Sequence, residues 1–237
     1  MTRLDQQTAT DLYTSGAYLE ENPDWHAGES EWKARAIARM LDSHGIRPSS
    51  VADVGCGTGD VLALLQATLP AGARLTGYDI APKAIELAQH KANDALSFEV
   101  GMPDDSDTFD LMLILDVIEH LEDGEGWLRS IRGKAAYTIL HLPLDLTVHR
   151  VIRPKALNDI RRRYGHLHFY NREVALSIVR TAGFEIVDSA YTEEFKEGQP
   201  NTFKAGLISL PRRMGYAISP DWSVRLLGGC RLLVLAK

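Results

Sequence analysis

The sequence predicts an α/β fold in which helices cover both faces of a largely parallel β-sheet. Helix and strand patterns alternate through residues 50–143, and most of the predicted strands are near-continuous apolar runs, as expected of strands buried on both faces. The first of these runs ends in a glycine-rich loop that leads directly into a helix. With 237 residues, 45% of them hydrophobic, the chain can bury one substantial core, so we expect one domain with additions.

The predicted elements follow one another in a regular order. An amphipathic helix covers about residues 29–41, where apolar residues recur at helical spacing, and Gly45 and Pro48 follow it as stop signals. The alternating part then reads strand "SVADVG", helix "DVLALLQATL", strand "RLTGYDI", helix "PKAIELAQHKA", strand "LSFEV", strand "FDLMLIL", helix "GWLRSIRGK" and strand "AAYTILHLP".

Downstream elements complete the chain. A basic helical segment, "IRPKALNDIRRRYG", precedes a helix that runs from Asn171, a plausible N-cap, to the breaker Gly183. Two final strands, "FEIVDSAYT" and "CRLLVLAK", flank a stretch that is too long for a hairpin turn. We divide the chain into an N-terminal helical cap (1–48) and a core (49–237) with an insertion at about 193–229, which covers the site or forms a homodimer contact.

Charge and composition exclude some classes of function. The 26 basic and 32 acidic residues argue against a broad nucleic-acid-binding face, which needs basic excess. The most apolar run, "LMLILDVI", is short and is interrupted by Asp116, so we expect no membrane span, no signal peptide and a cytoplasmic protein. Cys56 and Cys230 lack the C-x-x-C spacing, which indicates neither a disulfide nor a thiol mechanism.

The glycine-rich loop carries the most chemical information. In "VADVGCGTGDVLALL" the strand ends at Asp53, and Gly55, Gly57 and Gly59 follow. Asp60 stands where the dinucleotide fingerprint needs its third glycine, and its carboxylate would repel a pyrophosphate at the helix N-terminus. An NAD(P)-dependent oxidoreductase is therefore disfavoured.

A second acidic residue, Asp79, ends the next strand in "GYDIAPKAIELA". At that place a carboxylate can accept hydrogen bonds from the hydroxyls of a ribose. The third element of interest is "FDLMLILDVIEHLED", which puts Asp116 at the end of another strand. Because ligands of open α/β sheets bind beyond the carboxyl ends of the strands, these acids should lie near one another.

Together these three motifs resemble those of class I S-adenosylmethionine-dependent methyltransferases of the UbiE-like, type 11 branch. The resemblance covers about residues 50–184 and implies a Rossmann-like, doubly wound sheet of seven strands with the last strand antiparallel. It implies S-adenosylmethionine as cofactor and S-adenosylhomocysteine as product. In this reading Asp53 reaches the methionine ammonium, the glycines shape the bed of the methionine moiety, and Asp79 binds the ribose.

The resemblance also implies contacts for the rest of the cofactor. Ile80 should pack on the adenine, and Met102 stands where many relatives carry an acid that binds the adenine amino group. Asp116 and Val117 should face the transferable methyl group. The expected cofactor-binding residues are Asp53, Gly55, Cys56, Gly57, Gly59, Asp79, Ile80, Met102, Asp116, Val117 and Lys33, whose ammonium could pair with the cofactor carboxylate.

Four histidines are candidates for a catalytic base or a substrate contact. Methyl transfer is an in-line displacement, so a base is useful where the nucleophile carries a proton. His120, His141, His166 and His168 lie where strand-end loops should converge, although His120 and His141 could equally be structural.

The stretch "YGHLHFYNRE" contains two of these histidines. If it is extended, His166, His168 and Tyr170 point to one side, toward the acceptor, and Leu167 and Phe169 point to the other, where Phe169 anchors the loop. No acid or histidine follows at the spacing of a third ligand, so we expect no metal site. The passage is interpreted as a wall of the acceptor pocket.

Residues outside the core motifs could contact the substrate. Tyr18, Trp25 and His26 precede the first strand, where the segment of related enzymes often folds over the cofactor, although Trp25 could instead pack on the core. Arg150 and Arg153 begin a basic run that is either a solvated helix face or the rim of a pocket for an anionic acceptor.

The sequence thus predicts an S-adenosylmethionine-dependent methyltransferase that modifies oxygen or nitrogen of a small-molecule acceptor, an anionic one being an option. Two alternatives stay open. The chain could bind S-adenosylmethionine or S-adenosylhomocysteine as a catalytically silent scaffold, or it could methylate RNA, for which no second basic or aromatic-rich module is evident.

Overall fold

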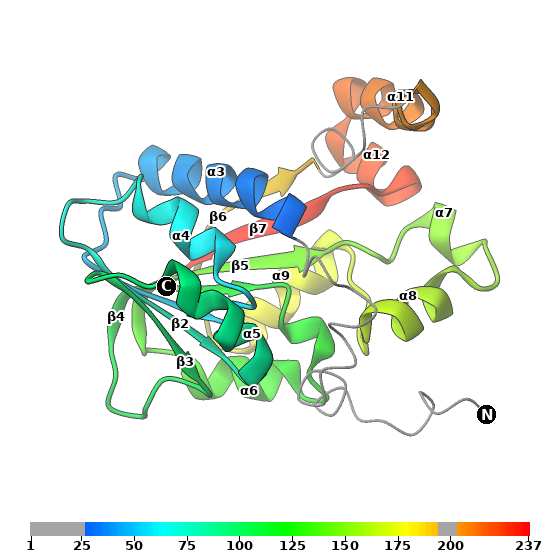
Figure 1. Cartoon of the computed structure of the whole chain (residues 1–237). Coiled ribbons are helices and arrows are strands. Elements are labelled where there is room, and N and C mark those ends of the chain that lie inside the picture. Colours follow the sequence, from blue (N-terminus) through cyan, green and yellow to red (C-terminus); the bar gives the residue numbers. More distant parts are fainter. Residues whose placement is uncertain (1–26, 194–202) are drawn as a thin grey trace.

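The computed structural model describes residues 27–193 and 203–237, and its strands form one seven-stranded sheet in the order β3-β2-β1-β4-β5-β7-β6 (Figure 1). The strands are β1 (Ser50–Val54), β2 (Arg74–Asp79), β3 (Leu96–Val100), β4 (Phe109–Leu115), β5 (Ala135–Pro143), β6 (Ile186–Thr192) and β7 (Arg231–Ala236). The first five pair in parallel, and β7 runs antiparallel to both β5 and β6. The predicted fold class is confirmed, including the antiparallel last strand.

Helices cover the two faces of this sheet, and short helices join its strands. In chain order the described helices are α3 (Ala27–Ser43), α4 (Asp60–Gln66), α5 (Pro82–Ala88), η2 (Gln89–Lys91), η3 (Ile118–His120), α6 (Gly124–Ile131), α7 (Val148–Val151), α8 (Ala156–Tyr164), α9 (Arg172–Thr181), α11 (Phe203–Ile218) and α12 (Pro220–Leu227). Each of these helices falls short of the length or the apolar character that a bilayer crossing requires.

Alternate residues of each central strand enter two separate cores. On β1, Val51 packs with α3, α4 and α5, whereas Ala52 packs with α6 and α9 on the opposite face. On β4, Leu113 and Ile114 divide in the same way. Because both faces are buried, both sets of positions are apolar, which explains the uninterrupted apolar runs of the sequence.

Helix α3 is built into the core. Ile37, Met40 and Leu41 are almost fully buried in the core on the α4 side of the sheet. The described part of the predicted cap, which begins at Ala27, therefore packs as one unit with the predicted core that follows residue 48. The remainder of the cap, residues 1–26, lies outside the described residues.

Two helical pairs lie beyond the carboxyl ends of the parallel strands (Figure 1). The predicted basic segment, residues 152–165, contains α8, and the short helix α7 precedes it after β5. The described part of the predicted insertion between β6 and β7 contains α11 and α12. Next to these pairs, α9 begins as predicted at Asn171, whose side chain accepts a hydrogen bond from Val174 N at 2.9 Å.

Candidate functional site

A cavity of about 480 Å³ opens at the carboxyl ends of the parallel strands, where β1 lies between β2 and β4. The strand order reverses at this point, which is where open α/β sheets bind ligands. The sequence-predicted residues that line the cavity are Lys33, Asp53, Gly55, Cys56, Gly57, Asp79, Ile80, Met102, Asp116, Val117, His120, Arg150 and His166. The described wall does not include Gly59, His141, Arg153, His168 or Tyr170. Tyr18, Trp25 and His26 lie outside the described residues.

The glycine-rich loop after β1 is shaped by close packing. Gly55 has a φ of 81°, and a Cβ there would lie 2.5 Å from Val117 Cγ2. Gly59 has a φ of 77°, and a Cβ there would lie 2.3 Å from the Phe98 ring. Gly59 therefore serves the packing of the loop on β3 and stays away from the cavity. Burial raises the pKa of Cys56, so this residue of the same loop remains a thiol.

Asp53 is a buried acid that lacks a full set of partners. Its exposed fraction is 1%, and among the described residues its Oδ1 has no hydrogen-bond partner. Burial and the charge of Asp79 raise its pKa to about 7, and Lys33 opposes this shift. Because an uncompensated buried carboxylate is costly, the cavity favours a cationic group beside Asp53.

Asp79 fixes the end of β2 and the glycine loop at once. Its Oδ2 accepts a hydrogen bond from Gly57 N at 2.9 Å, and its Oδ1 accepts one from Ala81 N at 2.8 Å. Burial raises its pKa, and the two backbone donors lower it in part. A carboxylate offers about four acceptor positions, so further hydroxyl donors can still bind. Next to it, Ile80 and Met102 are 42% and 39% exposed and provide an apolar surface at the same cavity.

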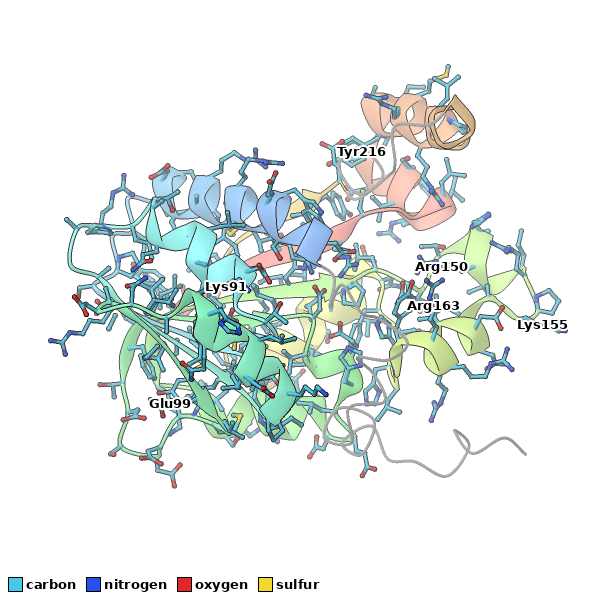
Figure 2. All side chains as sticks on the ribbon, in the orientation of Figure 1. Lys91, Glu99, Arg150, Lys155, Arg163 and Tyr216 are labelled. Atoms are coloured by element: carbon cyan, nitrogen blue, oxygen red, sulfur yellow. The ribbon has the colours of Figure 1, made fainter. Side chains whose placement is uncertain are left out.

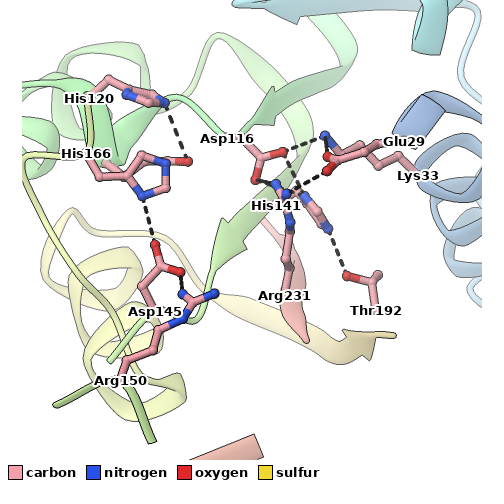
Figure 3. A network of polar contacts seen from close by, with 11 residues as sticks. Glu29, Lys33, Asp116, His120, His141, Asp145, Arg150, His166, Thr192 and Arg231 are labelled. Atoms are coloured by element: carbon pink, nitrogen blue, oxygen red, sulfur yellow. Dashed lines mark hydrogen bonds and ion pairs between the residues drawn. The ribbon is translucent and has the colours of Figure 1, made fainter. Parts of the chain in front are cut away.

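Asp116 occupies the centre of a network of charged side chains (Figure 3). It is the non-glycine residue with positive φ, 56°, in the part of the chain that the structure describes. Lys33 Nζ lies 2.8 Å from its Oδ2, Arg231 Nη1 lies 2.9 Å from its Oδ1, and His141 Nδ1 lies 3.2 Å from both oxygens. Although burial alone would raise it, Arg231, Lys33 and His141 hold the pKa of Asp116 well below its usual range. Asp116 is thus a fixed anion in a strained backbone conformation.

Glu29 completes this network from α3. It lies 2.8 Å from Lys33 Nζ and 3.0 Å from Arg231 Nη2. Against the effect of burial, these two cations lower the pKa of Glu29. The ammonium of Lys33, expected beside the cofactor carboxylate, therefore contacts two carboxylates of the protein itself. Glu29 and Arg231 were not predicted from the sequence. Two signals pointed to them: Glu29 lies four residues before Lys33, and Arg231 is a charged residue at the start of the apolar strand β7.

His141 lies behind Asp116 and outside the cavity wall. It is 1% exposed, and its Nε2 lies 2.9 Å from Thr192 Oγ1 while its Nδ1 faces Asp116. Burial lowers its pKa, and Asp116 counteracts part of that shift. With both ring nitrogens engaged, His141 is placed to position Asp116 instead of meeting an acceptor.

His120 and His166 reach the cavity together, on the side away from Lys33. Their ring centroids are 4.9 Å apart. His166 Nδ1 lies 2.8 Å from Asp145 Oδ2, and Asp145 also forms an ion pair with Arg150. His120 Nε2 lies 3.9 Å from Oε1 of Glu119, a fully buried acid. Asp145 and Glu119 were not predicted from the sequence as site residues, because Asp145 meets His166 only through the fold and no local pattern shows that Glu119 is buried.

The neighbouring part of "YGHLHFYNRE" is structural. It forms no strand, and the expected alternation is wrong because Tyr170, with an exposed fraction of 3%, packs in the core while Phe169 is only partly buried. His168 Nε2 donates toward the carbonyls of Leu121 and Glu122 at 2.9 and 3.2 Å. These contacts bind the segment to the loop after β4 and keep His168 away from the cavity.

The basic run divides into one cavity residue and a solvated face. Arg150 lines the cavity, whereas Arg153 is exposed outside it. Arg163 stacks over Tyr164, with the guanidinium carbon 5.2 Å from the ring centroid. Figure 2 shows Lys155 at the outer end of the α7–α8 pair, so most of this charge faces solvent.

Comparisons with known proteins agree with this geometry. A family model described as a methyltransferase domain matches residues 25–189. Ajmaline N-methyltransferase of Rauvolfia serpentina is 31% identical over 131 residues, covering 52% of this chain and 44% of that protein. Ubiquinone biosynthesis O-methyltransferase of Methylobacterium sp. (strain 4-46) is 32% identical over 127 residues, covering 48% and 47%.

A solved structure shows the same fold over most of the chain. Magnesium protoporphyrin IX methyltransferase from Synechocystis PCC 6803, crystallised with S-adenosylhomocysteine, superposes with a TM-score of 0.57 at 19% identity, covering 91% of this chain and 86% of that one. By contrast, the two curated relatives described above are matched over 44% and 47% of their own length.

Proposed function

The chain belongs to the family of methyltransferase-domain proteins, and from this premise we propose that it transfers the methyl group of S-adenosylmethionine to a small-molecule acceptor. The bound cofactor would supply a methyl group on a positively charged sulfur, which makes that carbon open to displacement by a nucleophile. The small-molecule class of acceptor is supported by the names of the curated relatives, ajmaline N-methyltransferase and ubiquinone biosynthesis O-methyltransferase.

The observation that carries the proposal is the pair of acids at the ends of β1 and β2. Asp53 has a buried oxygen without a partner, which suits the ammonium of the methionine moiety. Asp79 has acceptor positions left for the two ribose hydroxyls, and Ile80 and Met102 would flank the adenine. The residues of the chain therefore fit the three chemically different parts of this cofactor.

The protein's own residues would position the reacting atoms. Asp116 stays ionised, and its contacts with Lys33, Arg231 and His141 keep it from turning away. Glu29 in turn holds Lys33 and Arg231 in place. An anion fixed at this place would favour the positive charge of the sulfonium side of the cavity. Positioning of this kind supplies much of the rate of a displacement that needs in-line geometry.

The acceptor would enter on the side of His120 and His166. These are the predicted histidines that reach the described cavity wall, and their ring nitrogens lie where a proton from an acceptor hydroxyl or amine could be received. We assign an oxygen or nitrogen nucleophile to this side. An anionic acceptor is a finer option that rests on Arg150, whose charge is already shared with Asp145.

The test is methyl transfer from radiolabelled S-adenosylmethionine to panels of phenols, carboxylates and amines. We expect incorporation with at least one hydroxyl or amine panel and loss of incorporation in the Asp53→Ala variant. If S-adenosylhomocysteine binds but no panel or cell extract accepts a methyl group, the scaffold alternative gains. Incorporation only into RNA would contradict the small-molecule assignment.

A further inference from the structure

Glu119 is an anomaly of the loop that follows β4. Its side chain is 0% exposed, and among the described residues neither Oε1 nor Oε2 has a hydrogen-bond partner. A buried carboxyl group in this condition loses its hydration, and His120 Nε2, 3.9 Å from Oε1, is too distant for a hydrogen bond. Such a group favours a cation or a proton bound directly to its oxygens.

Two histidines face Glu119 from different segments. His120 follows it in η3, and His166 arrives from the loop after α8. One ligand atom from each of the three side chains can be chosen so that all three lie within 4.8 Å of one another. Four-coordinate zinc has ligand bonds of about 2.0–2.2 Å, which separates neighbouring ligand atoms by roughly 3.4 Å. The ligand atoms would therefore have to approach one another by at most about 1.4 Å.

The backbone holds these segments in register. Leu167 N donates to the carbonyl of Glu119 at 2.7 Å, and His168 N donates to the same carbonyl at 3.2 Å. The residue after His166 is thus anchored to the residue before His120. Little conformational freedom remains to be lost when a ligand joins the two loops.

Asp145 sets the orientation of the His166 ring. Its Oδ2 lies 2.8 Å from His166 Nδ1, which directs the Nε2 edge of that ring away from Asp145 (Figure 3). A histidine that donates Nδ1–H to a carboxylate keeps the lone pair on Nε2, and this pairing is the usual outer partner of a metal-binding histidine. Arg150 in turn neutralises Asp145 through an ion pair.

From this arrangement we propose that Glu119, His120 and His166 bind a divalent first-row transition metal ion. One carboxylate and two imidazoles with an open position are a ligand set that suits zinc and its neighbours, whereas magnesium prefers oxygen ligands. His120 and His166 line the cavity, so the open position would face the acceptor side. The sequence offered no third ligand for His166, because its partners lie 46 and 47 residues earlier and are brought together only by the fold.

A metal ion at this site would favour methyl acceptors that carry a hydroxyl group. Resting here on the proposed function, the inference is that an acceptor hydroxyl binds at the open position, where the ion favours its oxyanion form. The hydroxyl proton then leaves to solvent, because the ion replaces His120 and His166 as the group that activates the acceptor. Hydroxyl acceptors with a second oxygen nearby, such as catechols or hydroxy acids, fit such a site best. Metal binding itself does not depend on that assignment.

The first test is calorimetric titration of the metal-stripped full chain with Zn²⁺, and with Co²⁺ followed by its visible absorption. We expect one ion per chain and the absorption of inner-sphere nitrogen and oxygen ligands. Magnesium should not compete at similar concentration. Absence of zinc and cobalt binding, or binding of magnesium in preference, would overturn the proposal.

Matched variants separate a metal site from a structural cluster. Glu119→Gln keeps the shape and removes the charge, and His166→Asn can keep a donor to Asp145 while it removes the Nε2 ligand. Each should weaken zinc binding more than about a hundredfold, and Asp145→Asn by about 10- to 100-fold. His90→Ala, which removes an exposed histidine on η2, is the control and should leave zinc affinity unchanged.

Thermal unfolding of the metal-free proteins shows whether a variant loses zinc binding because it is misfolded. The Glu119→Gln variant should match or exceed the melting temperature of the metal-free parent, because it removes an unpartnered acid, yet zinc should no longer stabilise it. If zinc stabilises this variant and the parent equally, the site does not exist. S-adenosylhomocysteine titration of the same variants distinguishes the two proposals, since cofactor binding should persist when metal binding is lost.

Discussion

Replacing Asp53 with asparagine should stabilise the ligand-free protein and weaken cofactor binding at the same time. The change keeps the shape of the side chain and removes a buried charge whose Oδ1 lacks a partner among the described residues. The two effects have opposite signs because the charge costs free energy in the empty cavity and is used only when a cation arrives.

The magnitude follows from the pKa of Asp53, which burial and Asp79 raise from 3.8 to about 7. The folded state therefore binds a proton more tightly than the unfolded state. The free energy of unfolding of the parent falls as pH rises from 3.8 to about 7, and the full cost persists above that pH. At 1.36 kcal/mol per pKa unit, the stability gap between variant and parent should grow by about 2 kcal/mol between roughly pH 5.5 and pH 8.5.

Urea unfolding of both proteins at these two pH values measures the gap. Asp94→Asn, a change at an exposed acid, is the control and should shift stability by less than about 0.5 kcal/mol at either pH. In calorimetry the Asp53→Asn variant should bind S-adenosylhomocysteine more weakly by about 1.5–3 kcal/mol, the scale of a hydrogen bond to a charged group. A gap that does not change with pH, or an unchanged affinity, would refute the reasoning.

Three further substitutions probe other parts of the site. Asp79→Ala should weaken cofactor affinity by about 1–3 kcal/mol, because the ribose hydroxyls lose their acceptor; equal affinity in calorimetry would rule out that role. Gly59→Ala should lower the free energy of unfolding by about 1–3 kcal/mol in urea, since its Cβ would meet the Phe98 ring at a positive φ, and a neutral effect would contradict the packing described. Arg231→Met should lower the free energy of unfolding by about 2 kcal/mol or more. Lys33 and Arg231 each contact both Asp116 and Glu29, so the variant leaves the two acids with Lys33 as their shared cation; an unchanged free energy of unfolding would contradict this.

The sheet and the cofactor end of the cavity could be predicted from the sequence because the patterns that specify them are local. An apolar run, a glycine loop and an acid at a strand end lie within about thirty residues of one another, and Asp53 and Asp79 take their places directly from that order. All seven predicted strands are present. The division of apolar residues between two cores needed no knowledge of distant contacts.

The acceptor end of the cavity was harder to predict because its residues come from segments that are distant in the sequence. His141 was expected at the acceptor, but the antiparallel pairing of β7 with β6 and β5 sets Thr192 against one of its nitrogens and Arg231 beside Asp116. His166 acquires its partners Asp145 and Glu119 only through loop contacts that no spacing rule predicts.

The most direct test of the account is calorimetry of the full chain with S-adenosylhomocysteine, with NADH titrated in parallel. We expect one S-adenosylhomocysteine per chain, an affinity that rises with pH through about 7 as Asp53 loses its proton, and no binding of NADH. Binding of NADH without S-adenosylhomocysteine would contradict the assignment of the cavity.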